Sequence, residues 1–347
     1  MKKSIFLASA LLLAMSAACN KNDVSSEPTR QEGVPMTLTA TIGEPATKVS
    51  TTDDAANRKL TFEWEAGDKV SVISLDASHN LISNDIFTAD AAGSTTTFTG
   101  TYKGGASANQ VMVYYPALTE SYEDSGKTKW RVPVESGGYS DEGIMYDLYD
   151  EYISVRGWAY SLQTALDSPS HLKNYLIMVG EADKTDLASN KLTVTLNHNT
   201  TIFKVNLTLP SSGKTLKDVR LELKNADDSN SDFVSHGWGE SWRARGFSLA
   251  GGNNYATICL GSSVSGGSGT GLVAAGTTAT VYIPCTLSGM RDAIADGNPE
   301  VLTITSGQKF LVYVFTSDGF LTQTLTFAAD KELTPGRLYT INCAPTE

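Results

Sequence analysis

The side chains that most often carry enzyme chemistry are few in this 347-residue chain, and they are not spaced as catalytic motifs require. It has four histidines, which are His79, His171, His198 and His236. None lies in an H-E-x-x-H motif, no serine lies in a G-x-S-x-G turn, and the glycine-rich run 266–271 lacks the lysine of a phosphate-binding loop. A Ser-His-Asp triad stays open, because its members need not be neighbours in sequence. We nevertheless expect no enzymatic activity and no cofactor.

An acidic and aromatic segment, residues 139–152, is the best candidate for metal binding. Asp147, Asp150 and Glu151 carry carboxylates that could ligate Ca²⁺, but the regular spacing of a calcium loop is missing. A solvated acidic loop that rests its tyrosines on the protein is therefore the preferred interpretation. We expect no metal site.

A second segment, residues 236–247, contains Trp238 and Trp242 close to Arg243 and Arg245. Paired tryptophans in a glycine-rich loop can stack on sugar rings or anchor a protein partner. They can also simply stack on the neighbouring arginines. Trp238 and Trp242 are thus candidates for ligand contact, with a glycan as one ligand class.

Three cysteines lie in apolar runs typical of strands: Cys259, Cys285 and Cys343. An odd number cannot pair completely, and no two of them have metal-ligand spacing. Small buried hydrophobic residues are the preferred interpretation. One disulfide among the three is the alternative.

The N-terminus indicates where the protein goes. Lys2 and Lys3 precede an apolar run, Ile5–Met15, that is far shorter than the ~20 residues of a membrane-spanning helix. Small residues then lead directly to Cys19, an arrangement that resembles the lipobox of bacterial lipoproteins. The resemblance implies that residues 1–18 are a signal peptide and that Cys19 becomes the lipidated N-terminus. An ordinary secretory signal with a chance cysteine is the alternative.

The charge of the chain excludes some partners. With 27 basic and 38 acidic residues the net charge is −11, and loss of Lys2 and Lys3 makes it 25 − 38 = −13. Nucleic acid is therefore not an expected partner, because it requires a basic face. Residues 19–33 are polar and predict a flexible tether to the lipid anchor. Asn20 mildly favours the outer membrane by resemblance to sorted lipoproteins.

Elements that could position these residues are almost all strands. Short β-branched runs alternate with Gly, Asn, Asp and Ser clusters through the chain, as in MTLTATI at 36–42 and TIFKVNLTL at 201–209. One short helix is conceivable at 155–167. About fifteen strands suit two β-sandwiches. We place them at 34–186 and 187–347, with the boundary in the polar run 181–191.

Five segments in order resemble the fimbrillin-like lipoproteins of Bacteroidetes, the proteins of type V pili. The most specific is Phe62-x-Trp64-x-x-Gly67-Asp68-x-Val70-x-Val72, in which a strand that ends in Trp turns at Gly-Asp into the next strand. The other four segments are 36–48, 175–182, 198–207 and 333–339. The hairpin also makes sense without the family, since Gly67 and Asp68 favour a turn and the flanking apolar residues favour a core wall. Core packing is thus preferred over ligand binding for Trp64.

The resemblance implies two transthyretin-like sandwiches and a structural or adhesive role in a surface pilus. In that family a Lys/Arg-specific protease trims the first strand, and a strand from a neighbouring subunit fills the groove. Carried over, Lys48 is the candidate cleavage position, with Arg30 and Arg58 as alternatives. The alternative, equally open, is that these basic side chains are simply solvated and that the protease never cleaves the chain there. The implied partners are other pilus subunits, the outer-membrane lipid and a host receptor or glycan.

The last predicted strand could be donated or kept. It comprises Leu338, Tyr339, Thr340, Ile341, Asn342 and Cys343. If it is needed in its own sandwich, the resemblance implies a tip, an anchor or no pilin at all. A surface lipoprotein that binds glycans through its Trp and Tyr loops is the alternative function.

Overall fold

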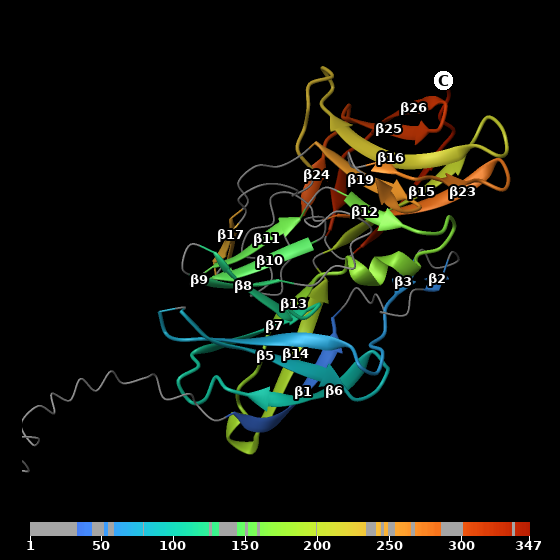
Figure 1. The fold of residues 1–347 in the computed structure, drawn as a ribbon. Helices are drawn as coiled ribbons and strands as arrows, with labels where there is room; N and C mark the ends of the chain where they lie inside the picture. The colour runs from blue at the N-terminus through green and yellow to red at the C-terminus, as the bar shows by residue number, and fades with distance from the viewer. Residues whose placement is uncertain are drawn as a thin grey trace, which may run out of the picture. The chain divides into compact units, whose positions relative to one another are not determined.

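The computed structural model confirms that the chain is all-β. Its described residues form strands and two short 3-10 helices, η1 (Ser170–Asn174) and η2 (Leu187–Ser189) (Figure 1). The described ranges are 33–43, 52–54, 59–78, 80–124, 127–131, 144–149, 152–157, 160–198, 200–233, 241–243, 246–248, 254–264, 268–285, 301–334 and 337–347. No helix in these ranges is long and apolar enough to cross a membrane.

Seven strands enclose the first hydrophobic core in one closed sheet of order β1-β14-β13-β7-β4-β5-β6. They are β1 (Val34–Ile42), β4 (Lys69–Leu75), β5 (Leu81–Ala89), β6 (Thr95–Tyr102), β7 (Gln110–Tyr115), β13 (Met178–Glu181) and β14 (Lys191–His198). β1 closes the sheet, because it pairs with β6 on one side and with β14 on the other. A closed sheet has no open edge along this circuit.

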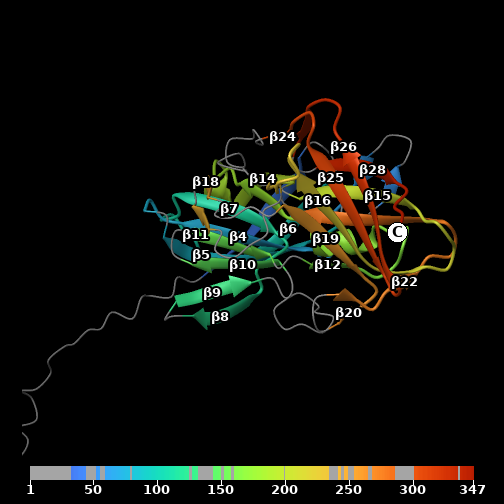
Figure 2. The ribbon, with the colours of Figure 1, turned by 90° about the horizontal axis from the view of Figure 1, so that it is seen from above.

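Two sheets supply the second hydrophobic core. The larger has the order β12-β19-β16-β25-β26, and Figure 2 shows β16, β25 and β26 side by side. Its strands are β12 (Tyr160–Gln163), β16 (Thr215–Lys224), β19 (Tyr255–Leu260), β25 (Lys309–Thr316) and β26 (Gly319–Thr326), with β22 (Leu272–Val273) beside β16. The smaller sheet contains β23 (Thr278–Cys285), β15 (Thr201–Thr208) and β28 (Leu338–Cys343).

The remaining strands form small pairs and one four-stranded sheet. These are β2 (Thr52–Asp54) with β3 (Lys59–Thr61), β8 (Glu120–Asp124) with β9 (Lys127–Arg131), β20 (Ser263–Val264) with β21 (Ser268–Gly269), β24 (Leu302–Ile304) with β27 (Lys331–Leu333), and the sheet of β10 (Ile144–Tyr149), β11 (Tyr152–Gly157), β17 (Ser241–Arg243) and β18 (Gly246–Ser248). The helix considered at 155–167 is wrong. The range begins inside strand β11, and it also contains the whole of strand β12. Cross-strand pairing of β12 with β19 overrides local helix propensity there.

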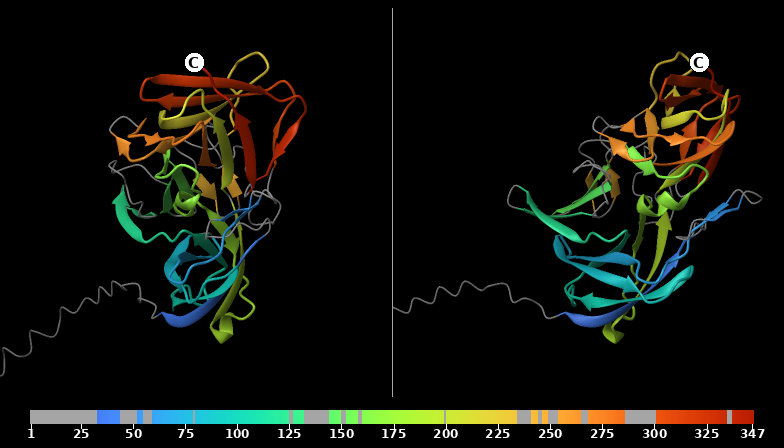
Figure 3. Two further views of the ribbon diagram at one scale, coloured as in Figure 1. Left: turned by 90° about the vertical axis from the view of Figure 1, so that its right-hand side faces the viewer. Right: turned by 45° about the vertical axis from the view of Figure 1, so that its right-hand side comes forward.

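The two cores are not consecutive in the chain, because the first core includes β14, which follows the expected boundary at residue 187, and also Tyr282 of β23. β14 belongs to the first barrel, because it pairs with β1 and β13 and buries Leu192, Val194 and Leu196 in the first core. The second core begins in β15, with Phe203 as its first buried residue. Gly33–Glu347 is one compact unit, so the division into two domains stays a prediction. Figure 3 shows the strands of this unit from two further sides.

Candidate functional site

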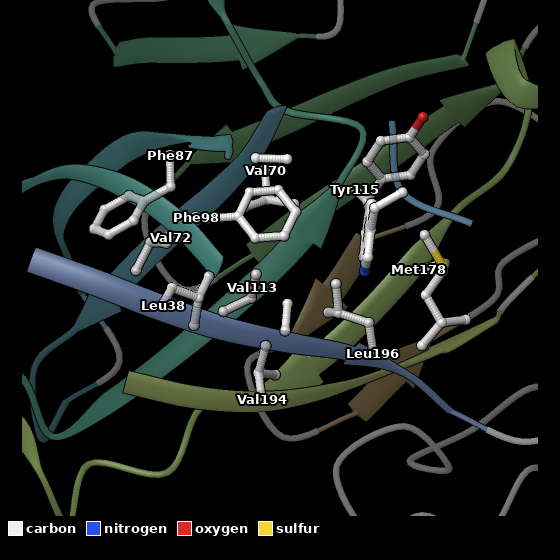
Figure 4. Packing of buried hydrophobic residues seen from close by; sticks show 14 of the residues in the cluster. Leu38, Val70, Val72, Phe87, Phe98, Val113, Tyr115, Met178, Val194 and Leu196 are labelled. Atoms are coloured by element: carbon white, nitrogen blue, oxygen red, sulfur yellow. The ribbon is translucent and has the colours of Figure 1, made fainter. Parts of the chain in front are cut away.

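β1 alternates between buried and exposed residues, as its sequence predicts for a wall strand. Met36, Leu38, Ala40 and Ile42 are each at most 8% exposed and belong to the first core. The intervening threonines point away from that core, with Thr39 exposed. In Figure 4, Leu38 extends from β1 toward the same interior as the side chains of the facing strands. β1 therefore fills a slot that is lined by apolar side chains.

Backbone hydrogen bonds hold β1 on both edges. It runs antiparallel to β6, with Leu38 opposite Phe98, and parallel to β14, with Leu38 aligned with Leu192. Beyond the ladders, the Thr37 amide donates to the Asn190 carbonyl at 3.0 Å, and the Gly43 amide donates to the Leu196 carbonyl at 2.8 Å. Without β1, the facing edges of β6 and β14 would lose these partners.

Trp64 lies in the core that β1 helps to enclose. It is fully buried, and its ring meets the rings of Phe98 and Tyr115 edge-on at centroid distances of 5.0 and 5.2 Å. Its backbone pairs with Gly93 in an isolated bridge. A buried ring of this kind cannot reach a soluble ligand, so the core interpretation of Trp64 is confirmed.

The turn that follows Trp64 has the geometry expected of Gly-Asp. Gly67 takes φ +93°, a left-handed conformation that favours glycine. The Glu65 amide donates to the Asp68 carboxylate at 2.8 Å, and the Asp68 amide donates to the Glu65 carbonyl at 3.1 Å. Burial raises the pKa of Asp68 above its ordinary value, against the effect of the Glu65 hydrogen bond. The turn leads directly into β4, which begins at Lys69.

The candidate donor strand, β28, is paired within its own chain. It runs parallel to β15 over six residue pairs, from Leu338 beside Ile202 to Cys343 beside Leu207. The Asn206 side-chain amide donates to the Asn342 side-chain oxygen at 2.8 Å. Residues 338–343 thus close the smaller sheet of the second core.

All three described cysteines are buried and unbridged. Cys285 and Cys343 lie beside opposite ends of β15, opposite Thr201 and Leu207 respectively, so about 20 Å of strand separates them. A disulfide needs Cα atoms within roughly 7 Å. Burial raises the pKa of the Cys343 thiol to about 11, and it raises that of Cys285 further. These are the small buried hydrophobic residues that the sequence predicts.

Several candidates lie outside the described residues: Cys19, Arg30, Lys48, Arg58, Asp150, Glu151 and Trp238. Trp242 is described only as part of β17, where it pairs with Ile153 of β11 and Phe247 of β18. Among the described residues no group of His, Cys, Asp and Glu could hold a metal ion. The ligand-contact role of Trp238 and Trp242 stays a prediction.

Sequence reasoning missed one cluster of surface side chains. Tyr313 and Phe315 alternate with buried residues along β25 and so point away from the second core. They gather with Arg220 of β16 on the outward face of the larger sheet. The signal was available in the run KFLVYVFT at 309–316, where large apolar residues occupy both faces of one strand.

The fold and the site define an all-β chain with a closed seven-stranded barrel, sealed by its first described strand, and a second core between two sheets. No protein-family model matches the chain, and no curated protein matches it in sequence.

Solved structures resemble it over most of its length. One is a protein assigned to cell adhesion from Bacteroides ovatus, with 12% identity, a TM-score of 0.41 and coverage of 90% of this chain and 95% of that one. A second, from Bacteroides uniformis and assigned to the same role, has 13% identity, a TM-score of 0.37 and coverage of 89% and 93%. The fimbrial anchor protein Mfa2 from Porphyromonas gingivalis has 9% identity, a TM-score of 0.32 and coverage of 85% and 83%.

Proposed function

We propose that this chain is a surface-anchored, fimbrillin-like lipoprotein and a structural or adhesive subunit of a pilus. In this proposal Cys19 carries the lipid that anchors the chain in the outer membrane, and proteolysis at Lys48 releases β1. A strand from another subunit then enters the empty slot. The single observation that carries the proposal is the place of β1, which closes the barrel between β6 and β14.

The energetics of the slot favour refilling. Met36, Leu38 and Ile42 each bury a large apolar side chain, which stabilises the barrel by about 1.5–3 kcal/mol per residue, or roughly 5–9 kcal/mol together before ordering costs. Two open strand edges add main-chain hydrogen bonds to any strand that enters. An unfilled slot would instead expose an apolar groove and two pairing edges, which favours aggregation.

The pairing of β28 supports a role in which this chain accepts a strand from another subunit and does not donate β28. Its six residues are held against β15, and Cys343 at its end is buried in the second core. Removing β28 for donation would open that core. We therefore infer that the strand that fills the β1 slot comes from a different segment of another subunit.

The test is to treat the purified full-length protein with a Lys/Arg-specific protease and to read its N-terminus and its oligomers. We expect a new N-terminus at Val49 together with ladders that resist SDS when a subunit that can donate a strand is present. Lys48→Ala should abolish both, whereas Arg58→Ala, a matched basic residue, should change neither. Cleavage only after Arg30 would leave β1 in place and should yield no ladders. Surface-extracted protein whose only N-terminus is acylated Cys19 would refute the processing step.

A further inference from the structure

Five side chains form a platform on the outward face of the larger sheet of the second core. The aromatic–arginine platform consists of Arg220 on β16, Tyr255 on β19, Tyr313 and Phe315 on β25, and Phe320 on β26. The strand register brings them together, because Arg220 lies opposite Tyr313, and Phe315 lies opposite Phe320. None of them belongs to the second core.

The guanidinium of Arg220 is fixed in place by three neighbours. Its central carbon lies 4.7 Å from the ring centroid of Tyr255 and 5.5 Å from that of Phe315. Its Nε donates to the Thr257 hydroxyl at 3.3 Å. The ring faces attract the guanidinium without accepting hydrogen bonds from its N–H groups. These N–H groups therefore stay available to a ligand.

The rings beside Arg220 form a continuous apolar surface. Tyr313 and Phe315 stack with a centroid distance of 6.2 Å and an interplanar angle of 20°. Phe320 joins both rings at 6.5 and 6.4 Å and is itself 56% exposed. An exposed aromatic ring at the end of such a cluster is a feature of binding surfaces more than of closed ones.

Charge on this sheet indicates what the platform would bind. Three lysines on or next to this sheet are neutralised within the chain: Lys214 by Asp318 at 3.0 Å, Lys224 by Glu222 at 2.9 Å and Lys309 by Asp228 at 2.6 Å. Arg220, in contrast, forms no ion pair with any carboxylate in the described part of the chain. It is a positioned cation with free donors on a protein of net charge −11.

We propose that the platform binds an acidic carbohydrate, one that carries carboxylate or sulfate groups. The free Arg220 donors would bond the anionic group, for which the guanidinium fork is suited. The C–H face of the neighbouring sugar ring would pack on Tyr313 and Phe320, since aromatic faces carry partial negative charge. Nucleic acid is disfavoured because its binding depends on many basic side chains that contact successive phosphates, whereas one acidic sugar requires a single positioned cation. The site is independent of strand exchange, because its residues lie outside the first core.

The test is affinity electrophoresis of the full-length protein in gels that contain hyaluronan, dextran sulfate or neutral dextran. We expect retardation by hyaluronan, dextran sulfate or both, which distinguishes carboxylate from sulfate, and none by dextran. Arg220→Gln and Phe320→Ser should each weaken the binding roughly tenfold to a hundredfold. Lys309→Gln is the matched control, since it removes the same charge from the same sheet but from a paired side chain, and it should leave binding within about twofold.

Three results would overturn the proposal. The first is that neither hyaluronan nor dextran sulfate retards the folded wild-type protein. Equal losses in Arg220→Gln and Lys309→Gln would mean that net charge alone is responsible. Sedimentation that shows a wild-type dimer broken by Phe320→Ser would make the platform an interface between copies of this chain. Phe320 lies at the exposed β25–β26 turn, so its truncation keeps the test valid even where Arg220→Gln fails to fold.

Discussion

Truncating Leu38 to alanine should loosen β1 more than any other part of the barrel. Leu38 is fully buried, faces the core beneath Phe98 and lies in the middle of β1 (Figure 4). A fully buried Leu→Ala change costs about 2–5 kcal/mol, as lost transfer free energy plus a cavity. If β1 opens as a unit, the same change raises the population of the open state roughly thirtyfold to several thousandfold.

Hydrogen exchange followed by mass spectrometry measures this directly. Peptides that cover β1 and the edges of β6 and β14 should exchange faster in Leu38→Ala, whereas peptides from β16 and β25 should be unchanged. Thr39→Ala is the matched control, because Thr39 is the exposed neighbour on the same strand and its truncation should cost less than about 0.5 kcal/mol. Equal acceleration in both cores would refute the reasoning, since it would mean that β1 does not open separately from the rest of the protein.

Three further outcomes are expected. Burial lowers the pKa of His171 from 6.5 to about 4, so the unfolded chain takes up a proton first and the free energy of unfolding should fall as the pH drops from about 6.5 to about 4; His171→Gln should lack this slope in denaturant titrations. Because burial raises the pKa of the Cys343 thiol to about 11 and raises that of Cys285 further, neither should react with a thiol reagent at pH 8 until the protein is denatured. A Cβ at Gly180 would lie 2.3 Å from a backbone oxygen of β14, so Gly180→Ala should lower stability by about 1–3 kcal/mol, whereas Gly276→Ala, whose Cβ would meet nothing closer than 4.0 Å, should be nearly neutral in thermal unfolding.

Local chemistry made part of the fold predictable. The Gly67-Asp68 turn and the alternation of β1 depend on residues that are neighbours in sequence, and both are found where the pattern places them. The buried state of the cysteines follows from their apolar neighbours in the same way. Such local patterns predict the structure correctly where tertiary packing favours the same conformation as the local sequence.

Long-range pairing could not be predicted in the same way. The polar run 181–191 has the composition of a domain linker, yet the strand after it, β14, returns to the first barrel. Its partner β1 lies about 150 residues earlier, and no property of either strand alone specifies a parallel pairing over that distance. The place of Arg220 beside the outward rings of β25 could not be predicted for a similar reason, since only the register of β16 with β25 brings them together.

The two edges of the β1 slot constrain what could replace β1 in the proposed exchange. β6 offers an antiparallel edge and β14 a parallel one, so an incoming strand that runs as β1 does would restore both ladders without moving either wall. Such a strand needs apolar side chains at every second position over seven residues, as at Met36, Leu38, Ala40 and Ile42. A one-residue shift would turn all four toward solvent. Small residues are required where Ala40 lies, because a larger side chain there would overpack a core that is already closed.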